Sequence, residues 1–422
     1  MRKLTVAQGT ALSAGAVLGT GIISMPALAD AIAGPSALVA WLALVLLSAP
    51  LAWTFGELGA RFPDGGGVSS YVRLAFGTRA ADAVGWIFFT AVPLGAPVAS
   101  SFAGGYVADV LGGGATTRFL TFLVIVGIVF GMNWLGLHIS GRAQLILTAT
   151  LAALLLATVV AALPHARIEN LTPFAPHGWP AVGTAAALLV WAFAGWEAMS
   201  SLSPDYADPR RDVPKATMLA VVVVGVLYLS VAFVSVLVLG PNLASSQAPL
   251  ADLLAVGVGG PVRPVVALVS VLLTIGAVNA YIAGASRLGF ALAQEGALPY
   301  RAFGSVRRSL VIVVLGAIAG AVLPIAQHTL LLLVTGGLTL VYVIGTAAAV
   351  KLLPGRGGKV VAAFAFACVC VLLWLTGWPA LLSLAIAAAA IVYRLSRDRV
   401  RLGAKAAGVS SRPTAGVVRR RS

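Results

Sequence analysis

The fold is decided in residues 7–29, AQGTALSAGAVLGTGIISMPALA. This apolar run is long enough to cross a bilayer, yet Gly19, Thr20 and Gly21 interrupt its middle and Pro26 follows a turn later. Glycine frees backbone groups from a helix, and a membrane tolerates such groups only where they line a cavity or meet another polar group. Small residues also permit close helix packing, so this break alone leaves both interpretations open.

A second interruption lies in the sixth apolar run, where WAFAGW at residues 191–196 places a small pair between aromatic residues, and Glu197 follows. Breaks in the first and sixth spans are expected of two five-helix repeats of inverted topology, because the first helix of each repeat is then discontinuous at the same place. Half-helix N-termini present N–H groups to a carboxylate, and freed carbonyls accept from an ammonium. The two breaks together predict a site for the zwitterionic head of a free amino acid.

The rest of the composition is that of an integral membrane protein. Of the 422 residues, 60% are apolar and 10% are charged, whereas soluble domains average about 25% charged. A soluble multidomain enzyme is therefore excluded. The first run is too long for the apolar core of a signal peptide, so we expect it to be a span. Twelve runs suit membrane spans: 7–32, 36–59, 81–108, 119–137, 143–163, 181–203, 216–239, 264–293, 309–327, 329–350, 360–377 and 379–395.

The distribution of positive charge predicts the orientation of these spans. With a cytoplasmic N-terminus, 25 of the 28 Lys and Arg residues fall on the cytoplasmic side, and only Arg118, Arg167 and Arg263 fall outside. Lys and Arg are enriched in cytoplasmic loops, so both termini are expected inside the cell. The net charge of +15 then reflects topology rather than a nucleic-acid partner, and the basic tail at 396–422 is expected to lie against anionic lipid.

Ionisable groups inside spans are costly, so the few that are present are functional candidates. Two carboxylates stand in apolar sequence, Glu57 and Glu197. Glu57 precedes Arg61 by four residues, which favours an interfacial ion pair. Cys368 and Cys370 lie two apart in one run, where they point in different directions, so a disulfide is not expected. The four histidines lack metal-ligand spacing, and no phosphate-binding or covalent-catalysis motif is visible, so we predict no metal, cofactor or catalytic residue.

Several motifs, occurring in order, resemble the amino acid–polyamine–organocation (APC) superfamily of transporters. They are residues 7–29, FPDGGGVSSYVRLAFG at 62–77 and FAGWEAMSSLSPDYADPRRDVPKA at 193–216, with further likeness in GWIFFTAVPLGAP at 85–97 and NAYIAGASRL at 279–288. Within the superfamily, the chain is most similar to the bacterial exporters of methionine and branched-chain amino acids. The resemblance implies an all-α, LeuT-like fold of twelve transmembrane helices. Its parts are a cytoplasmic N-terminus at 1–6, inverted repeats at 7–163 and 181–350, and two accessory helices at 360–395.

The resemblance also implies which residues bind substrate. The first break is expected to hold the carboxylate, through Gly19, Thr20, Gly21 and Ile22. Carbonyls of the second break are expected to hold the ammonium, near Phe193, Ala194 and Gly195. Trp191 matches an aromatic residue that closes over the substrate, and Tyr281 matches an aromatic residue that lines the pocket. Glu197 matches a carboxylate associated with gating. Some proton-coupled relatives carry a lysine in the fifth helix, which this chain lacks at 143–163, and proton antiport through Glu197 stays open.

The expected function is secondary transport of neutral amino acids, outward across the cell (inner) membrane, with a small-molecule amino acid and membrane lipid as partners. Uptake or exchange through the same fold is an open alternative, and a homodimer stays open too. A membrane-embedded amino acid sensor is the alternative from a different class. Sensors usually add a soluble output domain, and only about 27 residues follow the last predicted span, at 396–422.

Overall fold

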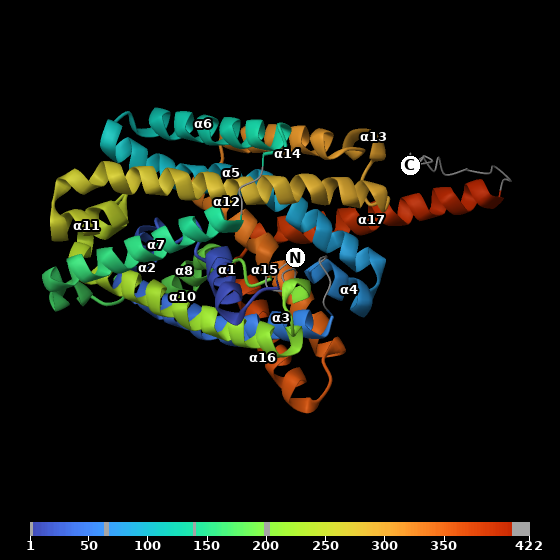
Figure 1. Ribbon diagram of the computed structural model, residues 1–422, viewed down its shortest axis with the longest axis horizontal. Coiled ribbons are helices and arrows are strands. Elements are labelled where there is room, and N and C mark those ends of the chain that lie inside the picture. The colour runs from blue at the N-terminus through green and yellow to red at the C-terminus, as the bar shows by residue number, and fades with distance from the viewer. Residues whose placement is uncertain (1–2, 63–66, 138–140, 198–202, 407–422) are drawn as a thin grey trace.

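A computed structural model describes residues 3–62, 67–137, 141–197 and 203–406 of the chain. Throughout these residues the structure is helical, and the only β pairing is an isolated parallel bridge between Leu4 and Tyr206. This confirms the predicted all-α class. Several long helices, among them α6, α12 and α17, run roughly along the long axis in Figure 1.

The helices of the described residues fall into chain order as follows. The first half contains α1 (Val6–Val17), α2 (Met25–Ala33), α3 (Ala37–Arg61), α4 (Val68–Phe76), α5 (Thr78–Leu111), α6 (Gly114–Trp134), α7 (Gly141–Ala162) and α8 (Pro180–Phe193). The second half contains α10 (Pro209–Leu239), α11 (Pro249–Val258), α12 (Arg263–Gln294), α13 (Tyr300–Phe303), α14 (Val306–Val322), α15 (Gln327–Leu352), α16 (Arg356–Leu375) and α17 (Pro379–Ala406). Short 3-10 turns follow several of them.

Nine helical stretches in the described residues are long and apolar enough to cross a bilayer, so the chain is a multi-pass membrane protein. They are Met25–Arg61, Thr78–Leu111, Gly114–Trp134, Leu145–His165, Pro209–Ser245, Gly260–Gln294, Gln327–Leu352, Arg356–Leu375 and Pro379–Arg399. The predicted spans without a counterpart of this length are the first, sixth and ninth. The first and sixth contain the two breaks, and the ninth is the 17-residue helix α14.

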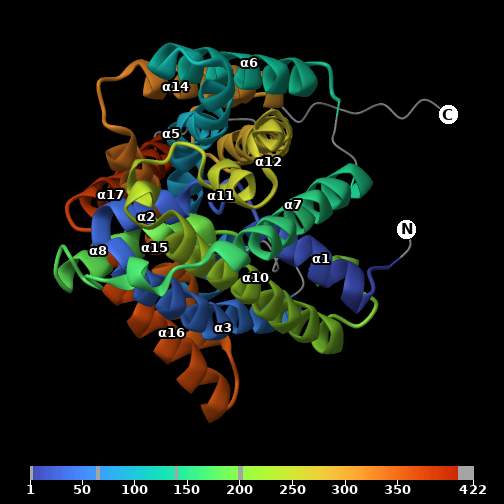
Figure 2. The ribbon, with the colours of Figure 1, turned by 90° about the vertical axis from the view of Figure 1, so that its left-hand side faces the viewer.

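Two large hydrophobic cores each pack a group of helices, and α5 and α12 contribute to both. One core joins α5, α6, α12 and α14, and the larger core joins α1, α2, α3, α8, α10 and α15 with other residues of α5 and α12. Figures 1 and 2 agree on this division, with α6 and α14 along the upper side and α3, α10 and α16 along the lower side. Trp191 packs against both cores. The middle of the molecule is therefore a boundary between two packed groups, and Trp191 lies on it.

The accessory helix α17 is tied to one end of the bundle. Arg394 lies 3.4 Å from the carboxylate of Asp82 on α5 and donates to the carbonyl of Glu295, just after α12. Arg397 donates to the next carbonyl, of Gly296. Free carbonyls at a helix C-terminus attract positive side chains, so α17 caps α12 while neutralising a carboxylate that is only 1% exposed.

Three short helices escaped the sequence analysis: α4, α11 and the single turn α13. The first two are the longer ones. They lie near opposite ends of the molecule in Figure 1, with α11 at the left and α4 at the right. Helix breaks lie near the predicted divisions among the last four spans: α14 ends at Val322, α15 begins at Gln327, and α17 begins at Pro379 after Gly377.

Candidate functional site

A cavity of about 320 Å³ lies where the two breaks meet. Its wall combines residues 15–21 with side chains of α5, α7, α12 and α15, and these are mostly Ala, Val, Leu and Phe. Eight of the ten residues expected at the site line it: Gly19, Thr20, Gly21, Trp191, Ala194, Gly195, Glu197 and Tyr281. The cavity is therefore apolar, with polar groups concentrated at the breaks.

The first break leaves backbone groups without partners, as the glycines predict. α1 ends at Val17 and α2 begins at Met25, and the N–H groups of Ser24 and Met25 return to the carbonyl of Gly21 at 3.1 and 2.8 Å. Among the described residues, the N–H groups at positions 20–23 donate to no acceptor. Buried amides normally find acceptors, and the donors of Thr20 and Gly21 belong to residues that line the cavity, so these two N–H groups are candidates for binding an anion there.

The two breaks interlock through direct backbone contact. A Cβ atom added to Gly21 would lie 2.8 Å from the Cα of Ala192, and one added to Gly195 would lie 2.6 Å from the carbonyl oxygen of Ala16. Gly195 also has a φ of +127°, which side chains rarely allow. Each break thus requires glycine because it rests on the backbone of the other half-helix.

The second break is held by side chains instead of helical hydrogen bonds. The N–H of Gly195 donates to Oε2 of Glu197 at 3.0 Å and to the hydroxyl of Tyr342 at 3.1 Å. The Tyr342 hydroxyl in turn donates to the same Oε2 at 2.5 Å. Trp196 donates from its indole to the hydroxyl of Ser48 at 3.2 Å. Glu197 therefore ties α15 to the break, and its carboxylate reaches the cavity wall.

Two aromatic side chains expected at the site contact the cavity differently. Trp191 meets Phe102 edge to face, with ring centroids 5.9 Å apart, and its far edge covers Gly95, where an added Cβ would lie 3.4 Å from the indole. Tyr281 remains 52% exposed. Trp191 therefore covers one part of the cavity, and Tyr281 of α12 lies in another part of its wall.

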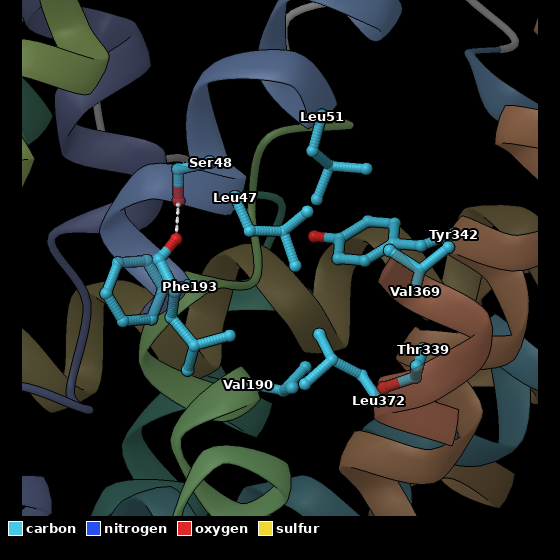
Figure 3. Close-up of a pocket in the computed structure, with 10 residues that line it drawn as sticks. Leu47, Ser48, Leu51, Val190, Phe193, Thr339, Tyr342, Val369 and Leu372 are labelled. Atoms are coloured by element: carbon cyan, nitrogen blue, oxygen red, sulfur yellow. Dashed lines mark hydrogen bonds between the residues drawn. The ribbon is translucent and has the colours of Figure 1, made fainter. Parts of the chain in front are cut away.

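Ile22 and Phe193 lie outside the cavity lining. Ile22 is fully buried. Phe193 packs against Trp41 and Tyr228, and its ring lines a separate hollow of about 20 Å³ among α3, α8, α15 and α16 (Figure 3). That hollow is about the size of one water molecule, too small for an amino acid.

The carboxylates within the spans are more numerous than the sequence analysis stated. Glu57 pairs with Arg61 at 2.9 Å, as predicted. However, Asp82 and Asp30 are also buried inside helices, so the count of two was wrong. Both lie within three residues of a predicted span boundary, at 7–32 and 81–108.

Tyr342 is the contact of Glu197 that the sequence analysis missed. It lies 145 residues away in the chain, so no local spacing connects the two. Tyr281 was expected at the site from the resemblance, whereas the available signal for Tyr342 was a polar hydroxyl within an apolar run, which was not used. The two cysteines are free, and in the part of the chain that is described no three His, Cys, Asp or Glu residues are placed to hold a metal ion.

Comparison with known proteins gives consistent matches across the chain. A sequence model of the family described as amino acid permease matches residues 4–356. The chain is 32% identical over 405 residues to the uncharacterized amino acid permease YecA of Bacillus subtilis, covering 93% of this chain and 95% of that protein. It is 30% identical over 396 residues to the L-methionine/branched-chain amino acid exporter YjeH of Escherichia coli, covering 91% and 94%. It is 27% identical over 248 residues to the branched-chain amino acid permease BcaP of Bacillus subtilis, covering 54% and 53%.

Proposed function

The chain belongs to the amino acid permease family, and from that premise we propose that it exports neutral amino acids of the methionine and branched-chain type by alternating access. The observation that carries the proposal is the pair of free N–H groups of Thr20 and Gly21 in the wall of an apolar cavity. A carboxylate there would receive charge-assisted hydrogen bonds, which are stronger than neutral ones. The relatives reported above are permeases and an exporter, not enzymes.

The cavity wall favours an apolar substrate side chain. Facing the breaks are apolar residues such as Phe88, Val92, Leu273 and Val334, and Glu197 is the only charged residue in the described lining. A charged substrate side chain would be buried without a counterion, at a cost of several kcal/mol. The exporter named above points to the same substrates, methionine and the branched-chain amino acids.

We assign the broken helices to the first and sixth of twelve membrane crossings, in two inverted repeats at 7–163 and 181–350. In support, the breaks at 18–24 and 194–197 follow half-helices of similar length, 12 and 14 residues. With both termini in the cytoplasm, Tyr281 lies in the inner half of α12, and Thr148 lies near the inner end of α7. On this assignment, we propose that substrate enters the cavity past Tyr281 and Thr148 from the cytoplasm, the side from which an exporter takes its substrate.

The proposed transport step moves the two packed groups relative to each other around the breaks. Trp191 lies between the two cores, so its indole would follow the motion and close over the substrate. Glu197 is the candidate for proton coupling, since its carboxylate accepts hydrogen bonds from Gly195 and Tyr342 and also reaches the cavity. Protonation there would weaken both hydrogen bonds and loosen the second break.

Inverted membrane vesicles test this proposal directly. Labelled L-methionine or L-leucine should accumulate in vesicles containing the protein, and an acidic interior should increase the accumulation if protons are exchanged. Accumulation only in right-side-out vesicles would instead support uptake. Absence of transport in both orientations, together with retained methionine binding, would support the sensor alternative.

A further inference from the structure

A single tyrosine hydroxyl contacts the ends of both half-helices. The hydroxyl of Tyr228, on α10, lies 2.8 Å from the carbonyl oxygen of Val17 and 3.0 Å from that of Ala192. Val17 is the last residue of α1, and Ala192 is the penultimate residue of α8. Both carbonyls belong to the backbone that the breaks release from regular helical pairing.

The position of this hydroxyl is fixed by the aromatic packing around its ring. Tyr228 is fully buried, and it meets Trp41 and Phe193 edge to face at centroid distances of 5.6 and 5.2 Å. Such aromatic contacts restrict the ring to one rotamer. The hydroxyl therefore cannot follow one carbonyl away from the other without moving α10.

A phenol hydroxyl carries one proton, so it donates to only one of the two carbonyls at a time. The carbonyl of Val17 also accepts from the N–H of Gly19 at 2.6 Å, whereas among the described residues the hydroxyl is the donor to the carbonyl of Ala192. If the hydroxyl followed α1, separation of the two half-helices would leave the buried carbonyl of Ala192 without this donor, which is unfavourable in a membrane interior. The hydroxyl consequently penalises independent motion of α1 and α8.

We propose that Tyr228 is a positioning residue that couples the inner half of the first span to the outer half of the sixth, so that the two ends of the transport pathway move together. The inference rests on the proposed function only in identifying these two ends as the inner and outer gates of a transport pathway. α1 precedes the first break, and α8 precedes the second, so in inverted repeats they lie on opposite sides of the cavity. A hydroxyl joining them transmits movement of one gate to the other.

A disulfide lock tests the coupling without any substrate. A Cβ added to Gly15 would lie 3.3 Å from the Cβ of Thr148, close to the roughly 3.5–4.5 Å between Cβ atoms in a disulfide. Gly15→Cys with Thr148→Cys, in a chain whose native cysteines are replaced by alanine, should therefore fasten α1 to α7. Spin labels at exposed Thr116 and Trp179 then report by electron–electron resonance on the far end of α8.

With Tyr228 present, we expect the oxidised lock to shift the mean distance between labels by about 2 Å, relative to a Gly15→Ala, Thr148→Ser chain. With Tyr228→Phe, we expect the shift to disappear. An equal shift in both chains, or no shift when Tyr228 is present, overturns the coupling. If the disulfide does not form, a second pair of spin labels at Gln8 and Gln294 is measured beside the pair at Thr116 and Trp179. Coupled ends should give correlated populations of the two distances, and uncorrelated populations would overturn the coupling.

Tyr106→Phe is the matched control, since Tyr106 is another fully buried tyrosine that contacts only one break. Its hydroxyl donates to the carbonyl of Ile23 and accepts from the N–H of Leu250. We expect this variant to lose thermal stability as Tyr228→Phe does, but to keep the lock-induced shift. Loss of the shift in both variants would show general damage and refute a specific role for Tyr228.

Transport kinetics add a readout that a purely structural role would not produce. In liposomes, we expect Tyr228→Phe to lower the turnover of L-methionine by roughly tenfold while KM stays within about twofold, because one hydrogen bond is lost in the moving step. A parallel rise in KM would contradict a positioning role. If the unmodified protein fails to move methionine, the proposed function fails, while the distance measurements still decide the coupling.

Discussion

Gly195→Ala should disable the site with the addition of one methyl group. Gly195 rests on the end of α1, and its added Cβ would lie 2.6 Å from the carbonyl oxygen of Ala16. Ordinary contact begins at 3.4 Å, so the second break must retreat from α1 by 0.8 Å. The φ of +127° adds a conformational penalty for alanine at the same position.

The two effects together give the expected magnitude. Overpacking costs about 1–3 kcal/mol, and an unfavourable backbone conformation costs about 1–3 kcal/mol more. Relaxation of the breaks can relieve part of this energetic cost, but the relaxation separates the free N–H groups from the carbonyls opposite them. If the binding-competent state is destabilised by only about 2 kcal/mol, the affinity for substrate falls by roughly 30-fold.

Binding of labelled L-methionine to purified protein measures this effect, with thermal unfolding recorded alongside. Gly284→Ala is the matched control, because an added Cβ at Gly284 on α12 meets nothing within 4 Å. The control should bind like the unmodified protein. The reasoning is refuted if Gly195→Ala binds methionine as tightly as Gly284→Ala does.

Four further outcomes are expected. Gly21→Val should abolish transport with normal membrane insertion, because its side chain would enter the backbone of α8; transport at the normal rate would place the carboxylate elsewhere. Lysine and aspartate should compete with labelled methionine far more weakly than leucine does, and equal competition would contradict an apolar side-chain pocket. Glu197→Gln should remove the dependence of transport on a pH gradient while exchange persists, and Glu57→Gln should not; the reverse pattern would move the proton site. Arg394→Ala should lower the unfolding temperature by several degrees, because it leaves the carboxylate of Asp82 buried and unpaired, and an unchanged temperature would show that the pair contributes little.

The sequence predicted what local composition determines. Long apolar runs indicate helices that lie in lipid, and glycines inside such a run indicate backbone groups that leave the helical hydrogen-bond pattern. The nine long apolar helices and both breaks could therefore be located from the sequence. Ile22 and Phe193 were expected at the site because the resemblance assigns whole stretches of backbone to it, and a motif match does not say which residues of a stretch line the cavity. The orientation of a side chain after a non-helical turn depends on that turn, not on spacing.

Contacts between distant residues explain the remaining omissions. The donors to Glu197 include a hydroxyl 145 residues away, and the two carbonyls at Tyr228 lie 211 and 36 residues from it. Such pairs follow from how helices pack, which one sequence does not reveal. The helices α4 and α11 were missed because they are only 9 and 10 residues long, too short to be recognised by a search for spans.

The interlocked glycines also shape how this chain can evolve. On the site proposed above, main-chain atoms hold the amino acid head group, and substitution cannot alter their chemistry without displacing the backbone. The opposite wall consists of side chains, and at Gly95 an added Cβ would make only an ordinary 3.4 Å contact with Trp191. Mutations there can reshape the volume left for the substrate side chain at little structural cost. Selectivity among amino acids is consequently free to drift between related chains, while recognition of the amino acid head group is inherited unchanged.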